Sequence, residues 1–64
     1  SIIKINRNPI DFLLNLREIG YSIFEINKTH QRLDSVTDFQ KFIDNIPQGK
    51  YADIYCEKKS ILCP

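Results

Sequence analysis

The segment NPIDFLLNLREIGYSIFEI, residues 8–26, decides the fold that we expect for this chain. Asn8 is a favoured N-cap residue, and Pro9 suits the first helical position, where its missing N–H costs nothing. Gly20 supplies the left-handed residue that ends many helices, and a β-rich run at residues 21–27 follows at once. The segment therefore predicts a helix that leads directly into a strand.

The apolar residues of this segment occupy more than one side of each predicted element. In the strand, Phe24 and Ile26 share one face while Tyr21 and Ile23 share the other. Both faces are mostly apolar, and we therefore expect a sheet that is covered on both sides. The apolar positions of the helix cover a wide arc, which predicts packing on more than one side; they are Ile10, Phe12, Leu13, Leu14, Leu16 and Ile19.

Two further strands and a second helix are predicted on either side of that segment. Residues 2–6 form a short β-branched run, and residues 51–57 alternate in the manner of a strand. Residues 27–32 are polar and predict an exposed loop. Ser35 begins a capping-box pattern for a second helix. One narrow apolar stripe on that helix predicts that it packs on the sheet; the stripe consists of Val36, Phe39, Phe42, Ile43 and Ile46.

The predicted order is strand, helix, strand, helix, strand, which indicates an α/β fold. We expect a small three-stranded mixed sheet with two helices. The first connection between strands contains a helix and is long enough to join two parallel strands. No linker, repeat or low-complexity tract interrupts residues 1–64. The chain is therefore expected to be a single small α/β domain or the C-terminal fragment of a larger α/β domain.

Length and charge exclude several classes of protein. The 64 residues are 42% hydrophobic, which suits a globular domain rather than a disordered tail. Nine basic and eight acidic residues give a net charge of +1, too small for the phosphate-binding field of a nucleic-acid protein. The longest uninterrupted apolar runs have three residues, far fewer than a membrane span needs. We expect a cytoplasmic protein that binds neither nucleic acid nor a membrane.

The two cysteines and the single histidine do not form a recognisable metal-site or disulfide pattern. Cys56 and Cys63 are seven positions apart, which is no zinc-ligand spacing, and only His30 could join them. We expect no metal site, an exposed loop histidine and two reduced thiols, with Cys56 buried in its strand. A disulfide between the two cysteines stays open as the alternative.

No pattern in the sequence predicts catalysis or cofactor binding. The only glycines are Gly20 and Gly49, and there is no glycine-rich phosphate-binding loop. No serine or cysteine stands in the sequence context of a nucleophile beside a base. We therefore assign no catalytic, cofactor-binding or metal-binding residue. Glu25 and Asp53 each lie inside a predicted strand, where a carboxylate pairs with Lys or Arg or with a ligand, and their role stays open.

Three stretches resemble the C-terminal part of FkbM-type methyltransferases, a class I family that uses S-adenosylmethionine. They are Leu-Arg-Glu-Ile-Gly-Tyr at 16–21, Ile-Phe-Glu-Ile at 23–26, and Tyr-Ala-Asp-Ile-Tyr-Cys at 51–56, with two lysines at 58–59. The resemblance implies a last strand that runs antiparallel and inserts between the other two. The family holds its cofactor in the N-terminal half, on a glycine-rich loop and an acidic residue that this sequence lacks. No cofactor-binding or catalytic residue is therefore carried over.

The resemblance implies the C-terminal structural segment of a methyltransferase, not catalytic by itself. S-adenosylmethionine would be the cofactor of the parent chain only, and the partner would be the remainder of that chain. The lack of methionine in all 64 residues also suggests a fragment or a processed chain. The alternative is a free-standing small α/β protein-interaction module without catalysis. A homo-oligomer partner would then stabilise it, because domains of this size are marginal.

Overall fold

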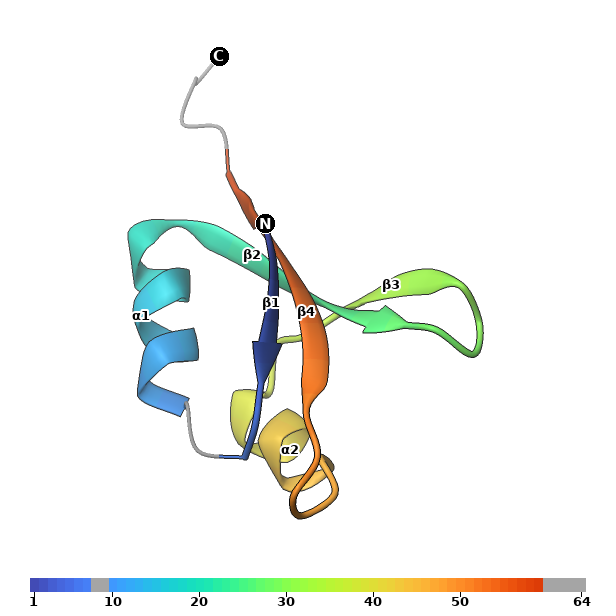
Figure 1. The fold of residues 1–64 in the computed structure, drawn as a ribbon. Helices are drawn as coiled ribbons and strands as arrows, with labels where there is room; N and C mark the ends of the chain where they lie inside the picture. Colours follow the sequence, from blue (N-terminus) through green and yellow to red (C-terminus); the bar gives the residue numbers. More distant parts are fainter. Residues whose placement is uncertain (8–9, 60–64) are drawn as a thin grey trace.

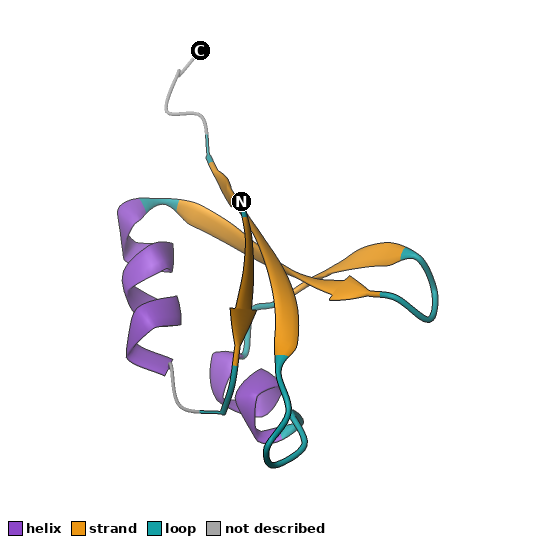
Figure 2. Cartoon of the chain, in the orientation of Figure 1, coloured by secondary structure: helices purple, strands orange, loops and turns teal. Residues whose placement is uncertain are grey.

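The structure is a computed structural model that describes residues 1–7 and 10–59. The chain is α/β, as expected from the sequence. The elements within the described residues, drawn in Figures 1 and 2, are β1 (Ile2–Ile5), α1 (Ile10–Ile19), β2 (Tyr21–Asn27), β3 (Arg32–Ser35), α2 (Phe39–Asp44) and β4 (Ala52–Lys58).

The sheet has four strands in the order β1-β4-β2-β3, and every neighbouring pair is antiparallel. The prediction of a three-stranded mixed sheet is therefore wrong. The additional strand, β3, lies partly in the stretch that the sequence predicted to be an exposed loop. It forms because Asn27 accepts a hydrogen bond from the backbone N–H of His30, and Gln31 takes a φ of 53° that reverses the chain. β3 then pairs with β2 through Glu25↔Asp34 and its neighbours.

The last strand lies between the other two predicted strands, as the family resemblance implied. β4 pairs antiparallel with β1 on one side and with β2 on the other, in the registers Ile3↔Ile54 and Ile23↔Cys56. Since both neighbours oppose β4, β1 and β2 run in the same direction, with α1 in the connection between them (Figure 1).

Helix α1 ends as predicted, but only one of its sides is buried within the described chain. Gly20 has a φ of +114°, and its N–H donates to the carbonyl oxygens of Leu16 and Arg17. The proposed cap at Asn8 and Pro9 lies outside the described residues. Leu13 is fully buried, whereas three apolar residues expected to pack on a second side are exposed: Phe12, Leu14 and Ile19.

Helix α2 begins later than the capping-box pattern predicted. Ser35 belongs to β3, and the next residue, Val36, donates its backbone N–H to the carbonyl oxygen of Ile23. The backbone therefore stays extended until Asp38, whose carboxylate caps the helix by accepting from the N–H of Lys41. The apolar stripe does join the core: Phe39, Ile43 and Ile46 are buried, and Val36 and Phe42 pack against it.

The core lies on one face of the sheet only. Strand residues alternate between the two faces, and the buried ones all fall on the face that α1 and α2 cover: Ile5, Ile23, Ile54 and Cys56. We call the opposite face the open face. It carries a row of apolar side chains from all four strands, in which Tyr55 is paired with both Ile2 and Phe24, and Ile26 is paired with Leu33. No described helix buries this row, and Ile2 and Leu33 are 69% and 50% exposed. The expectation of a sheet covered on both sides is therefore wrong for the described chain.

Candidate functional site

Asp53, one of the two strand carboxylates singled out in the sequence, forms ion pairs with two lysines. Its Oδ1 and Oδ2 lie 3.2 Å and 2.9 Å from the Nζ atoms of Lys4 and Lys28. Lys4 stands directly across the β1–β4 pair, and Lys28 follows the end of β2. The hydrogen bond from Lys28, followed by that from Lys4, lowers the pKa of Asp53 from its ordinary value of 3.8. The carboxylate therefore links β4 to β1 and to the residue that follows β2, and it is not poised to act as an acid.

We expect Asp53→Asn to lower the thermal midpoint at pH 7, and this difference to disappear in acid. The folded-state pKa of Asp53 is depressed, so its charge stabilises the fold fully at pH values above its ordinary, unfolded-state pKa of 3.8. That contribution is lost as the pH falls through the folded-state pKa. Circular dichroism melts of both proteins at pH 7 and at several values below 4 measure the effect. The control is Glu57→Gln, an exposed carboxylate on the same strand. A difference that persists unchanged in acid would show that the amide disturbs packing instead.

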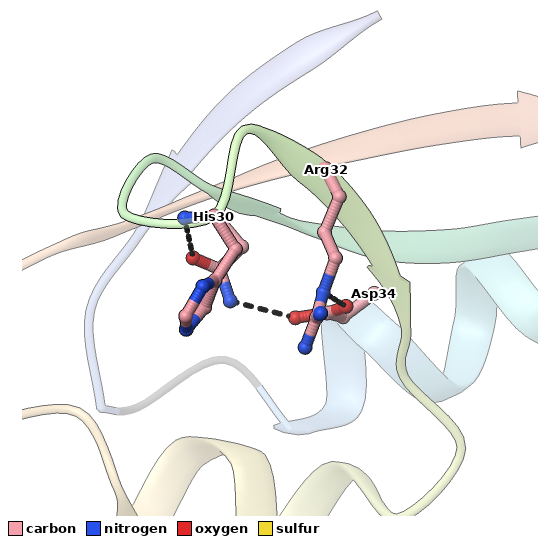
Figure 3. A network of polar contacts seen from close by, with 4 residues as sticks. His30, Arg32 and Asp34 are labelled. Carbon is pink, nitrogen blue, oxygen red and sulfur yellow. Dashed lines mark hydrogen bonds and ion pairs between the residues drawn. The ribbon is translucent and has the colours of Figure 1, made fainter.

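A second carboxylate, Asp34, anchors the hairpin of β2 and β3 (Figure 3). Its oxygens accept from Asn27 Nδ2 at 2.9 Å and from Arg32 Nε at 2.7 Å, and these contacts lower the pKa of Asp34. The side-chain oxygen of Asn27 in turn accepts a hydrogen bond from the backbone N–H of His30. His30 itself is exposed. His30 thus contributes its backbone to a turn, in agreement with an exposed loop histidine. This network was not predicted from the sequence. The signal that could have indicated it is the polar segment from Asn27 to Asp34, in which an Asn and an Asp stand on either side of a turn.

Glu25, the other strand carboxylate, lies on the opposite face of the sheet from Asp53. Its register partners are Asp34 on β3 and the fully buried Ile54 on β4, so it belongs to the face that the helices cover. The residue is half-buried, and its side chain has no hydrogen bond or ion pair within residues 1–7 and 10–59. The structure therefore separates Glu25 and Asp53 and does not make one site of them.

Two open cavities lie at the end of the sheet where β1 and β2 terminate. The larger, about 440 Å³, is bordered mostly by exposed polar residues, among them Asn6, Arg7, Asp44 and Lys50. The other, about 380 Å³, lies between the end of β2, the end of α2 and the start of β4. We call the second cavity the β2 groove, and we define it by Glu25, Asn27, Phe42, Asn45, Ile46 and Tyr51.

Cys56 is a buried free thiol in the core. Burial raises its pKa from the ordinary value of 9.0, which disfavours the reactive thiolate. The other cysteine, Cys63, lies outside the described residues, so their pairing stays a prediction. In the described part of the chain, no three His, Cys, Asp or Glu residues are grouped to hold a metal ion. No helix there is long and apolar enough to cross a bilayer.

Most of the titratable groups considered above are either paired or buried. Asp34 and Asp53 are engaged in holding strands together, and Cys56 is buried in the core. Glu25 is the one half-buried carboxylate among the described residues without a partner, and it borders an open groove. Comparison with models of known protein families finds no match, and comparisons with curated proteins and with solved structures find none either.

Proposed function

We propose that this chain is the C-terminal structural segment of an S-adenosylmethionine-dependent, FkbM-like methyltransferase. It would complete the sheet of the parent enzyme without supplying a catalytic residue. The observation that carries the proposal is the position of β4, which runs antiparallel between two strands of common direction. This is the arrangement that the sequence resemblance implied for the C-terminal end of the methyltransferase sheet.

The residues that carry the resemblance occupy the elements of that arrangement. The stretch 16–21 ends α1 and turns into β2, the stretch 23–26 lies in β2, and residues 52–56 lie in the inserted strand β4. β3 is an addition at the far edge of the sheet and leaves the order β1-β4-β2 intact. The proposal therefore rests on a sequence pattern and a strand order that agree.

The described surface also favours a larger partner. The open face carries an uncovered apolar row, and the outer side of α1 exposes Phe12, Leu14 and Ile19. A domain of about 60 residues buries only about 60% of its unfolded surface and is marginally stable. Further chain packed against the open face and the outer side of α1 would supply the missing burial.

We expect residues 1–64 alone not to bind S-adenosylmethionine. A dinucleotide-like cofactor site of this fold class needs a glycine-rich turn after a strand and an acidic residue for the ribose, and the sequence has neither. Cofactor and methyl acceptor would both be held by the remainder of the parent chain, and the reaction is assigned to no residue described here. A free-standing interaction module remains the competing proposal, since a second copy could also cover the open face.

The two proposals make opposite predictions about the reading frame and about cofactor binding. Sequencing the transcript upstream of Ser1 should reveal a strand, a glycine-rich loop and a later acidic residue in frame. In calorimetric titrations the complete polypeptide should then bind S-adenosylmethionine saturably, whereas residues 1–64 alone should show no binding. Micromolar binding by residues 1–64, or an upstream frame without the loop, would contradict the methyltransferase proposal. The second outcome would favour the interaction module.

A further inference from the structure

The β2 groove holds an unmatched negative charge. Three carboxylates are half-buried in the sheet, namely Glu25, Asp34 and Asp53. Asp53 is held by two lysines and Asp34 by an arginine and an amide, but Glu25 has no such partner among the described residues. Residues 8–9 and 60–64, which are not described, contain no Lys, Arg or His. Within residues 1–64, the undescribed positions therefore offer no cationic partner for Glu25.

Glu25 also faces an acidic neighbour across the sheet. It stands directly opposite Asp34 in the antiparallel pair of β2 and β3, and like charges in that relation destabilise a sheet. Arg32 forms an ion pair with Asp34, with 2.7 Å between Nε and Oδ1. Lys41 borders a neighbouring hollow together with Glu25 but forms no ion pair with it, so a bound cation beside Glu25 would offset the repulsion.

The groove is an open hollow that has room for a small molecule. Its volume of about 380 Å³ falls within the range of ligand pockets. The half-buried Phe42 and the buried Ile46 give it apolar walls, while Asn45 and Tyr51 add a polar amide and an exposed phenol ring. Lys28 and Asp53 also border it, but they pair with each other at 2.9 Å. Glu25 is thus the charge that a ligand would meet unpaired.

We propose that the β2 groove binds a small organic cation, a primary amine or guanidine with a short apolar body, through the Glu25 carboxylate. An ionised carboxylate only accepts hydrogen bonds, so the ligand must donate them. An ammonium or guanidinium group does so with charge assistance, which makes the bond stronger than a neutral one. The apolar body lies against Phe42 and Ile46. The site does not depend on methyltransferase chemistry and belongs to the chain under either proposed function.

The test is a titration of the ¹⁵N-labelled chain with benzylammonium, followed by two-dimensional NMR. Saturable shifts are expected for backbone amides at 25–29 and 42–46, with a dissociation constant of about 1 mM for so small a ligand. Benzyl alcohol and benzoate, which match its shape without the positive charge, should produce no saturable shift. Equal binding of either one would overturn the proposal, because the groove would then be recognising only the ring.

Variants at Glu25 separate the charge from the shape of the groove. Glu25→Gln should weaken the binding of benzylammonium about tenfold or more, since a charge-assisted hydrogen bond is roughly twice as strong as a neutral one. Glu25→Asp should retain binding, and Glu57→Gln, on an exposed acid elsewhere, should leave it unchanged. Without ligand, Glu25→Gln should melt at or above the wild-type midpoint, because it removes the repulsion with Asp34. Unaltered affinity in Glu25→Gln, or a lower midpoint, would overturn the assignment.

Discussion

Phe39→Ala is expected to leave the isolated chain largely unfolded at 25 °C. Phe39 is 4% exposed, lies in the first turn of α2, and shares the core with Ile43 and Ile54. Its ring also faces the guanidinium of Arg17 on α1, with 4.7 Å from Cζ to the ring centroid. Truncating a buried Phe to Ala typically costs about 3–5 kcal/mol, and a domain of this size rarely holds more than about 3–5 kcal/mol. The loss therefore matches the whole free energy of unfolding.

Circular dichroism melts and urea titrations of three variants test this. Lys41→Ala changes an exposed position on the same helix and should leave the midpoint near that of the wild type. Phe42→Ala, at a half-buried position, should fall between the two. If Phe39→Ala and Lys41→Ala have the same unfolding midpoint, the helix is not anchored by the core described above, and the assignment of its buried side is wrong.

The parts of the fold that the sequence predicted are those with a local cause. β2 was predicted with both of its ends, because Gly20 stops α1 and apolar residues begin directly after it. The insertion of β4 came from the family resemblance, since no periodicity specifies which strands become neighbours. β3 escaped prediction because its turn is marked by Gln31 in a left-handed conformation rather than by glycine. The capping-box pattern at Ser35 did not begin the helix, because Ser35 pairs with Phe24 in the sheet and Asp38 caps α2 instead.

The candidate site was less predictable because it depends on which strands become neighbours. The sequence singled out Glu25 and Asp53 and foresaw pairing with Lys or Arg or with a ligand. Only the register shows that Lys4 stands opposite Asp53 and that Glu25 stands opposite Asp34. The faces also follow from the register, and they place the two carboxylates on opposite sides of the sheet. The groove beside Glu25 requires α2 and the start of β4 to be in position.

Leu13→Ala is expected to destabilise the chain strongly, whereas Leu14→Ala is not. The two leucines are adjacent on α1, but Leu13 is 0% exposed and Leu14 is 38% exposed. The substitution is identical and both sites are helical, so the intrinsic helix preference changes equally. A fully buried Leu→Ala costs about 2–5 kcal/mol through lost burial and the cavity that remains, and Leu13 packs in the core with Phe39 and Ile54. Midpoints of urea unfolding for the three proteins measure the difference.

The Leu14 variant also reports on what covers the outer side of α1. In a monomer, Leu14→Ala should change the free energy of unfolding by less than about 1 kcal/mol, as surface substitutions usually do. A loss as large as that of Leu13→Ala, together with a midpoint that rises with protein concentration, would mean that a second copy buries this side. In the complete polypeptide of the methyltransferase proposal, the same loss should appear without any dependence on concentration, because the covering segment belongs to the same chain. The concentration dependence of the unfolding midpoint of Leu14→Ala therefore distinguishes coverage by the parent chain from coverage by a second copy.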